Sequence, residues 1–160
     1  MARARPIPGF AEAHSFEDAG GRAVRVRTEE LFAHAEGVLD TGDIERVHDM
    51  RVATRRLRAA LEIFAPCFPR KEHHALLREV KRLAGVLGKR RDPDVSVAEL
   101  ERVAAALTAN ERPGIRHLVA ELRSEQAGAN DLLAAELERV VAERLHARLL
   151  ALAAGVRVVA

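Results

Sequence analysis

The sequence predicts an all-α protein, an antiparallel bundle of about five helices with a basic groove. Ala, Leu, Arg and Glu dominate the chain, and all four are good helix formers. Apolar residues recur at spacings of three and four, as at Leu76, Val80 and Leu83, which places them on one helix face directed at a core. Strand-like alternation is confined to 24–27 and 156–159. Helices packed around one core are therefore the expected architecture.

Glycine, proline and capping residues divide the chain into an expected flexible N-terminal tail over 1–21 and a helical bundle over 22–155. The first three helices are expected over residues 22 or 28 to 39, 44 to 64, and 70 to 88 or 89. Asp43 is suited to cap the second helix, and Pro66 and Pro69 end it.

The later helices are expected to restart at two prolines. Asp92-Pro93 combines an N-cap residue with proline at the first helical position, so a fourth helix is predicted from there to about Ala109. Residues 110–113, which include Pro113, are expected to separate this helix from the next. One long helix, or two shorter ones with a break at 128–130, then follow to about residue 152.

Size and composition set the class of protein. A chain of 160 residues forms one domain and buries roughly 70% of its unfolded surface. With 48% hydrophobic and 31% charged residues it is expected to be globular rather than disordered. No apolar run approaches the roughly 18 residues that cross a bilayer, and the first ten residues do not resemble a secretory signal. Cys67, the single cysteine, has no disulfide partner within the chain. Together, these observations lead us to expect a cytoplasmic protein that does not bind a membrane.

The positive charge is concentrated in the middle of the chain. Residues 46–91 contain 13 of the 26 Lys and Arg residues and only four acids, a local charge of +9. The flanks, 1–45 and 92–160, carry −4 and −3, so the net charge is only +2. A basic centre between mildly acidic flanks indicates a local anion site.

The second expected helix is cationic along one face. His48, Arg51, Arg55 and Arg58 fall within about 80° of arc, opposite the apolar residues, whereas Arg56 lies to the side. The planar guanidinium of arginine binds phosphate oxygens in bidentate fashion. We interpret this face as acid-free and therefore as a binding surface rather than a solvated one.

The third expected helix repeats the arrangement. Four cations fall within about 100° of arc: Arg78, Lys81, Arg82 and Lys89. Gly85 and Gly88 lie on or beside this face and leave it without bulk, so an extended ligand could approach the backbone. If the two helices are antiparallel neighbours, their cationic faces line one groove.

Two blocks, VHDMRVATRRLR at 47–58 and LGKRRDPDV at 87–95, resemble the signature of the CHAD family, the conserved histidine α-helical domain. The resemblance covers roughly residues 25–150. It implies an all-α fold that binds inorganic polyphosphate in a basic groove. From the residues themselves we expect neither catalysis nor a cofactor. Asp92 and Asp94 match the acidic positions of the second block.

The polyphosphate-binding residues that the two cationic faces and the resemblance predict come from both helices. They are His48, Arg51, Arg55, Arg56, Arg58, Arg78, Lys81, Arg82, Lys89 and Arg91.

The chain departs from the family in one respect. Members usually carry a second half with its own His- and Arg-rich helix, and no such helix follows residue 100. The protein therefore resembles one half of the usual domain. Either one half suffices, or two copies pair as a homodimer, for which the apolar stretch at 131–152 is the expected contact.

Two alternatives remain open. Glu45-x-x-His48 and Glu143-x-x-His146 have the spacing of di-iron bundles, although His48 shares its face with arginines that disfavour a dication. Nonspecific nucleic-acid binding is the other alternative. The chain has no Trp or Tyr on which bases could stack, which makes nucleic-acid binding a weaker interpretation than polyphosphate binding. No arrangement of catalytic residues is apparent, and we expect no metal.

Overall fold

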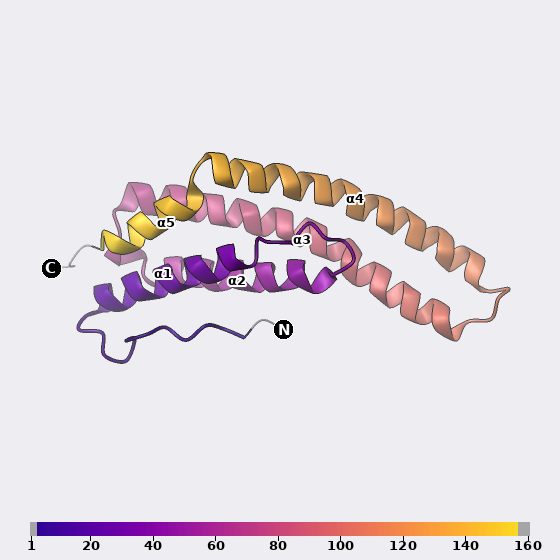
Figure 1. Cartoon of the computed structure of the whole chain (residues 1–160), viewed down its shortest axis with the longest axis horizontal. Helices are drawn as coiled ribbons and strands as arrows, with labels where there is room; N and C mark the ends of the chain where they lie inside the picture. The colour runs from indigo at the N-terminus through magenta and orange to yellow at the C-terminus, as the bar shows by residue number, and fades with distance from the viewer. Residues whose placement is uncertain (1–2, 157–160) are drawn as a thin grey trace.

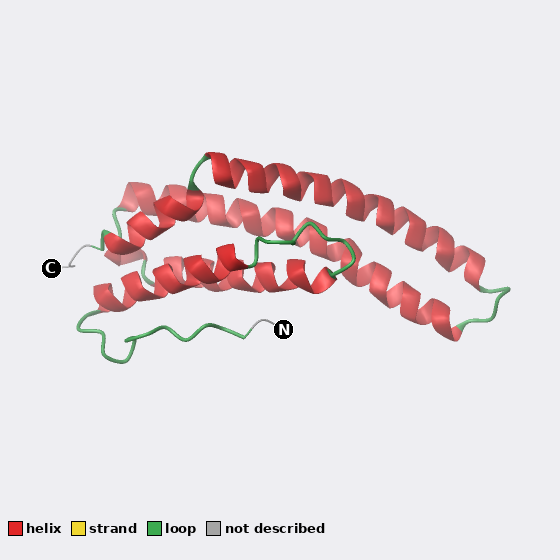
Figure 2. Ribbon diagram, in the orientation of Figure 1, coloured by secondary structure: helices red, strands yellow, loops and turns green. Residues whose placement is uncertain are grey.

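The computed structural model describes residues 3–156 and confirms the all-α prediction, with five packed helices and no strand in that range (Figure 2). The helices are α1 (Phe16–Ala33), α2 (Ile44–Ile63), α3 (Arg70–Ala106), α4 (Arg112–Ala142) and α5 (Leu145–Ala154). A short 3-10 turn, η1 (Ala65–Cys67), joins α2 to α3.

The helices form a layered bundle with one long hairpin. α2 packs between α1 and α3, α4 runs back along α3, and α5 returns to pack on α1. Figure 1 shows the far ends of α3 and α4 extending beyond α1 and α2. Among residues 3–156, no helix combines the length and apolar character needed to cross a bilayer.

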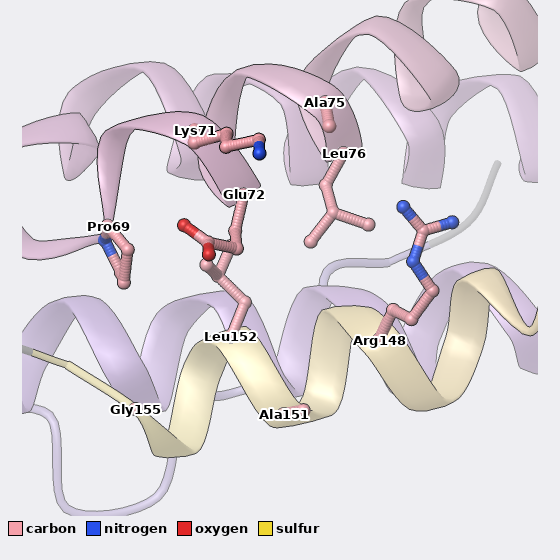
Figure 3. Close-up of a pocket in the computed structure, with 9 residues that line it drawn as sticks. All are labelled: Pro69, Lys71, Glu72, Ala75, Leu76, Arg148, Ala151, Leu152 and Gly155. Atoms are coloured by element: carbon pink, nitrogen blue, oxygen red, sulfur yellow. The ribbon is translucent and has the colours of Figure 1, made fainter.

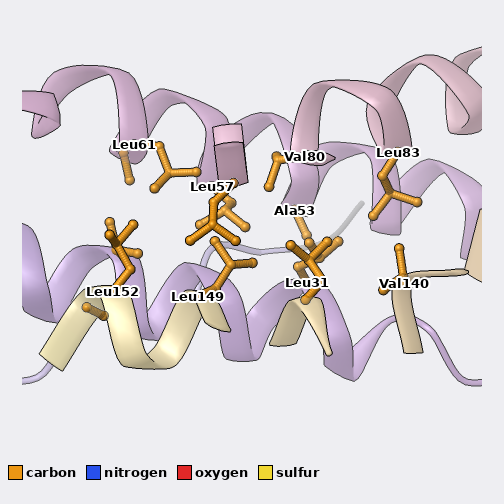
Figure 4. Close-up of a cluster of buried hydrophobic side chains, with 14 of the residues drawn as sticks. Leu31, Ala53, Leu57, Leu61, Val80, Leu83, Val140, Leu149 and Leu152 are labelled. Carbon is orange, nitrogen blue, oxygen red and sulfur yellow. The ribbon is translucent and has the colours of Figure 1, made fainter. Parts of the chain in front are cut away.

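The core lies where all five helices meet. Leu31, Leu57, Val80, Val140 and Leu149, one from each helix in turn, point into the same space (Figure 4) and are at most 3% exposed. Burying a side chain of this kind stabilises the fold by about 1.5–3 kcal/mol. This packing fixes which face of each helix is left to solvent.

The first helix begins earlier than the sequence predicts. The hydroxyl of Ser15 caps α1, which starts at Phe16, so residues 16–21 are helical rather than part of a tail. Gly20 and Gly21 are buried in this helix because neighbouring groups approach closely. A Cβ on Gly20 would lie 2.9 Å from a ring carbon of Phe64. The glycine pair therefore marks tight packing of α1.

α3 continues through Pro93, where the sequence predicts a new helix. Proline lacks the N–H that would bond one turn back, so helix interiors normally exclude it. Here Pro93 is buried, and the residues around it pack on α4, which compensates for the lost hydrogen bond. Asp92 is thus an interior helical residue rather than an N-cap, and Figure 1 shows α3 changing direction along its length.

The break between α4 and α5 also lies away from its predicted place. α4 runs unbroken through 128–130, and the chain turns at Arg144, whose φ of 55° is in the left-handed region. The turn directs Leu145, Leu149 and Leu152 into the core. These leucines are therefore not available as the dimer contact expected over 131–152.

Candidate anion-binding site

The buried face of α2 determines where its cations lie. Met50, Leu57 and Leu61 are fully buried, so the opposite face of the helix points outward. Arg51 and Arg55 lie on that outward face and are exposed, as the spacing along α2 predicts.

Cationic side chains from α2 and α3 line one pocket of about 560 Å³. The lining residues are His48, Arg51, Val52, Arg55, Arg58, Lys81, Ala84 and Gly85. No aspartate or glutamate is among them. A Cβ on Gly85 would meet no atom within 4 Å, so the backbone of α3 is open at this point.

Two of the lining arginines have uncompensated charges. Arg51 and Arg55 form no ion pair with any residue between 3 and 156. Arg78 and Lys89 are likewise exposed and unpaired within that range, but they do not line the pocket.

Arg58 and Lys81 share a carboxylate at one end of the pocket. Nζ of Lys81 lies 3.0 Å from Oε1 of Glu62, and Nε of Arg58 lies 3.8 Å from the same oxygen. The interpretation of the α2 face as acid-free is therefore wrong at Glu62. The spacing of four between Arg58 and Glu62 is typical of such a pair.

Three of the predicted binding residues point elsewhere. Arg56 donates a hydrogen bond of 2.7 Å to Glu30 on α1, and Arg82 donates one of 2.9 Å to Glu136 on α4. Arg91 donates a hydrogen bond of 2.9 Å to the backbone carbonyl of the first residue of α2. Each of the three thus joins two helices.

A buried polar cluster joins α3 to α4 beside the proline. Arg90 is fully buried and pairs with Asp94, and its Nε donates a 3.0 Å hydrogen bond to Asn130. Gln126 also donates to Asp94, at 2.6 Å. Asp94, an acidic position of the family signature, is therefore the partner of a buried arginine and lies away from the pocket.

The two Glu-x-x-His motifs do not converge. In residues 3–156, Glu45 and His48 group with Asp49, with ligand atoms within 4.8 Å of one another. His146 instead lies against Phe32 of α1, with ring centroids 4.4 Å apart. The structure therefore does not assemble a two-motif metal centre.

A second pocket, of about 470 Å³, lies between the start of α3 and α5 (Figure 3). Its cations are Lys71 and Arg148. Arg148 is held by Glu79 at 2.8 Å, and Glu72 adds a carboxylate to the lining. This mixture of charges makes it a poorer anion site than the pocket between α2 and α3.

The fold and this site define an all-α helical domain with a cationic pocket between two adjacent helices. A family model for the CHAD domain matches residues 22–158, most of the chain, and the protein therefore belongs to the CHAD domain family. Comparisons with curated proteins and with solved structures yield no match.

Proposed function

We propose that this CHAD domain binds inorganic polyphosphate in the pocket between α2 and α3, without catalysing a reaction. One observation carries the proposal. Five side chains that offer cationic or N–H donors line a single pocket, no carboxylate is among its lining residues, and Arg51 and Arg55 are unpaired within residues 3–156. Membership of the CHAD family supports the same ligand.

The spacing of the donors suits an extended anion. His48 and Arg58 are ten residues apart on α2, about 15 Å along the axis. Each arginine can bind two phosphate oxygens through its planar fork, and His48 adds a ring N–H. A chain of linked phosphates can contact all of these groups at once, whereas one phosphate cannot.

Nucleic acid is the weaker candidate for the same pocket. Recognition of single strands uses aromatic side chains on which bases stack, and no aromatic residue other than His48 lines the pocket. Phe64 and Phe68 are buried, and Phe32 lies against His146. Nonspecific contacts to a phosphate backbone are all that the pocket offers to DNA or RNA.

Calorimetric titration with long-chain polyphosphate tests the proposal. We expect binding at low salt that weakens steeply as salt rises, because each neutralised phosphate releases counterions. ATP and a duplex DNA of equal total charge serve as competitors and should displace the chain poorly. Absence of binding at low salt would refute the proposal. Equal competition by DNA would favour the nucleic-acid alternative.

We also propose that two copies pair around one polyanion. The pocket is open on one side of a single chain, and a two-fold homodimer would place a second set of cations opposite the first. Two such charged surfaces repel each other, so the anion between them would stabilise the pair. Val141 of α4 is 76% exposed and can supply an apolar contact.

A further inference from the structure

Glu62 pairs with two of the cations that line the pocket, Arg58 and Lys81. Its Oε1 lies 3.0 Å from Nζ of Lys81 and 3.8 Å from Nε of Arg58. Lys81 comes from α3, whereas Arg58 and Glu62 come from successive turns of α2. The carboxylate thus binds both cations at one end of the pocket, where a phosphate group would bind.

The position of Glu62 continues the cationic row of α2. The row runs through residues 48, 51, 55 and 58 at alternating spacings of three and four, and 62 is its next place. At 100° per residue, Glu62 falls within the same arc of about 80° as the cations. A residue at position 62 therefore lies on the same outward face of α2 as Arg51 and Arg55.

Exposure separates this ion pair from the two that hold Arg56 and Arg82. Glu30 and Glu136, the partners of Arg56 and Arg82, have side chains only 1% and 3% exposed. Glu62 is 43% exposed, and its two cationic partners are similarly accessible. Exposed pairs of this kind contribute little to stability, and water can replace either partner. The Glu62 carboxylate can therefore leave its cations without disturbing the fold.

We propose that Glu62 is a resident counter-ion that occupies the Arg58 and Lys81 end of the pocket until a phosphate chain displaces it. This inference rests on the proposed function. The pocket then has an open end, at Arg51 and Arg55, and a closed end, at Arg58 and Lys81. A polyanion binds first at the open end and gains the closed end only as its phosphates replace the carboxylate.

Glu62→Gln tests the inference, with Glu125→Gln as the matched control. Both substitutions remove one negative charge from an exposed glutamate, but Glu125 lies on α4, which packs mainly on α3. We expect Glu62→Gln to tighten binding of long-chain polyphosphate by about three- to tenfold, the effect of one unit charge at contact distance in water. Glu125→Gln should change it less than twofold.

A double-mutant cycle identifies the displaced group. In the wild-type background Lys81→Ala should weaken binding only slightly, because Glu62 already holds that ammonium. In the Glu62→Gln background the same substitution should cost about tenfold, because the freed lysine now contacts phosphate. The difference between the effects of Lys81→Ala in the two backgrounds measures how strongly Glu62 competes with phosphate for Lys81.

The outcomes separate this inference from the function on which it rests. If wild-type protein binds polyphosphate, but Glu62→Gln and Glu125→Gln behave alike or the cycle shows no coupling, the counter-ion role is overturned and the function stands. If neither wild-type nor Glu62→Gln protein binds at low salt while circular dichroism shows both folded, the function and the inference fail together.

Discussion

Nη1 of Arg56 lies 2.7 Å from Oε1 of Glu30, so the guanidinium of Arg56 is held on α1 rather than in the pocket. Its neighbour in sequence, Arg55, lines the pocket and is exposed. Two adjacent arginines of one signature block are thus placed by the helical rotation of 100° in different environments. One supports the fold, and the other is available to a ligand.

We expect Arg51→Ala and Arg55→Ala each to weaken polyphosphate binding by about 1–3 kcal/mol, through loss of charge-assisted contacts. Their free energy of unfolding should stay unchanged or rise, because repulsion between the cations falls. Arg56→Ala should do the reverse. It should lower the free energy of unfolding by about 1–3 kcal/mol and leave binding nearly unchanged. Calorimetry and urea denaturation of the three variants provide both values.

Arg139→Ala is the control for that series. Arg139 forms ion pairs with Glu136 and Glu143 outside the pocket, so its loss should reduce stability without altering binding. Equal losses of affinity in Arg51→Ala, Arg55→Ala and Arg139→Ala would mean that the whole surface attracts the anion and that no defined site exists.

The buried carboxylate of Glu30 makes stability depend on acid pH. Burial favours its neutral form, but the hydrogen bond from Arg27 and the charges of Arg27 and Arg56 outweigh burial and hold the pKa of Glu30 below its ordinary value of 4.5. A lowered folded-state pKa contributes stability that is present above the unfolded value and is lost as pH falls through the folded value. We therefore expect unfolding free energy to fall from about pH 5 downward, and less steeply in Glu30→Gln. Urea denaturation at several pH values measures both slopes, and parallel curves would contradict the prediction.

Arg90 and Asp94 form a fully buried ion pair, and each depends on the other. Asp94→Ala leaves the guanidinium charge uncompensated in the interior and should cost about 3–5 kcal/mol of unfolding free energy. The double replacement Arg90→Met with Asp94→Leu should cost much less, because neither charge is then buried. Chemical denaturation distinguishes the two cases. A double variant as unstable as Asp94→Ala would show that shape, rather than charge, matters there.

The fold class and the α2 surface could be predicted because both depend on local periodicity. The sequence predicts a helix over 44–64, and α2 spans Ile44–Ile63, with Pro66 just beyond its end. The predicted side-chain cap by Asp43 is wrong, because its carboxylate accepts a hydrogen bond from Arg46 instead. A rotation of 100° per residue then brings Arg51 and Arg55 to one face without any knowledge of neighbouring helices. Which of these residues bind phosphate stays a prediction.

The remaining site residues depend on partners far away in sequence. Glu30 is 26 residues from Arg56, and Glu136 is 54 residues from Arg82, so no local pattern indicates either pair. Pro93 is a similar case, because the local sequence Asp92-Pro93 predicts the start of a helix and gives no information about packing on α4. Tertiary packing of α3 on α4 overrides that preference.

Two glycines test whether the open backbone of α3 matters for binding. A Cβ on Gly85 or on Gly128 would meet no atom within 4 Å, and both residues lie inside helices. Substitution by alanine should therefore raise the free energy of unfolding by about 0.5–1 kcal/mol in each case. Only Gly85→Ala should also weaken polyphosphate binding, because its methyl group enters the pocket. Equal affinities of the two variants would show that phosphate does not approach this part of α3.

Because the leucines of α5 face the core, we take Val141 of α4, the most exposed of the large apolar side chains in residues 3–156, as the contact for a two-fold pair. Cationic pockets brought together repel each other, so pairing should be weak alone and stronger when polyphosphate lies between them. Light scattering should show concentration-dependent dimers that polyphosphate stabilises, and Val141→Glu should reduce them while a single chain still binds. A monomer at high concentration, with and without polyphosphate, would contradict pairing and leave each chain to bind the anion alone.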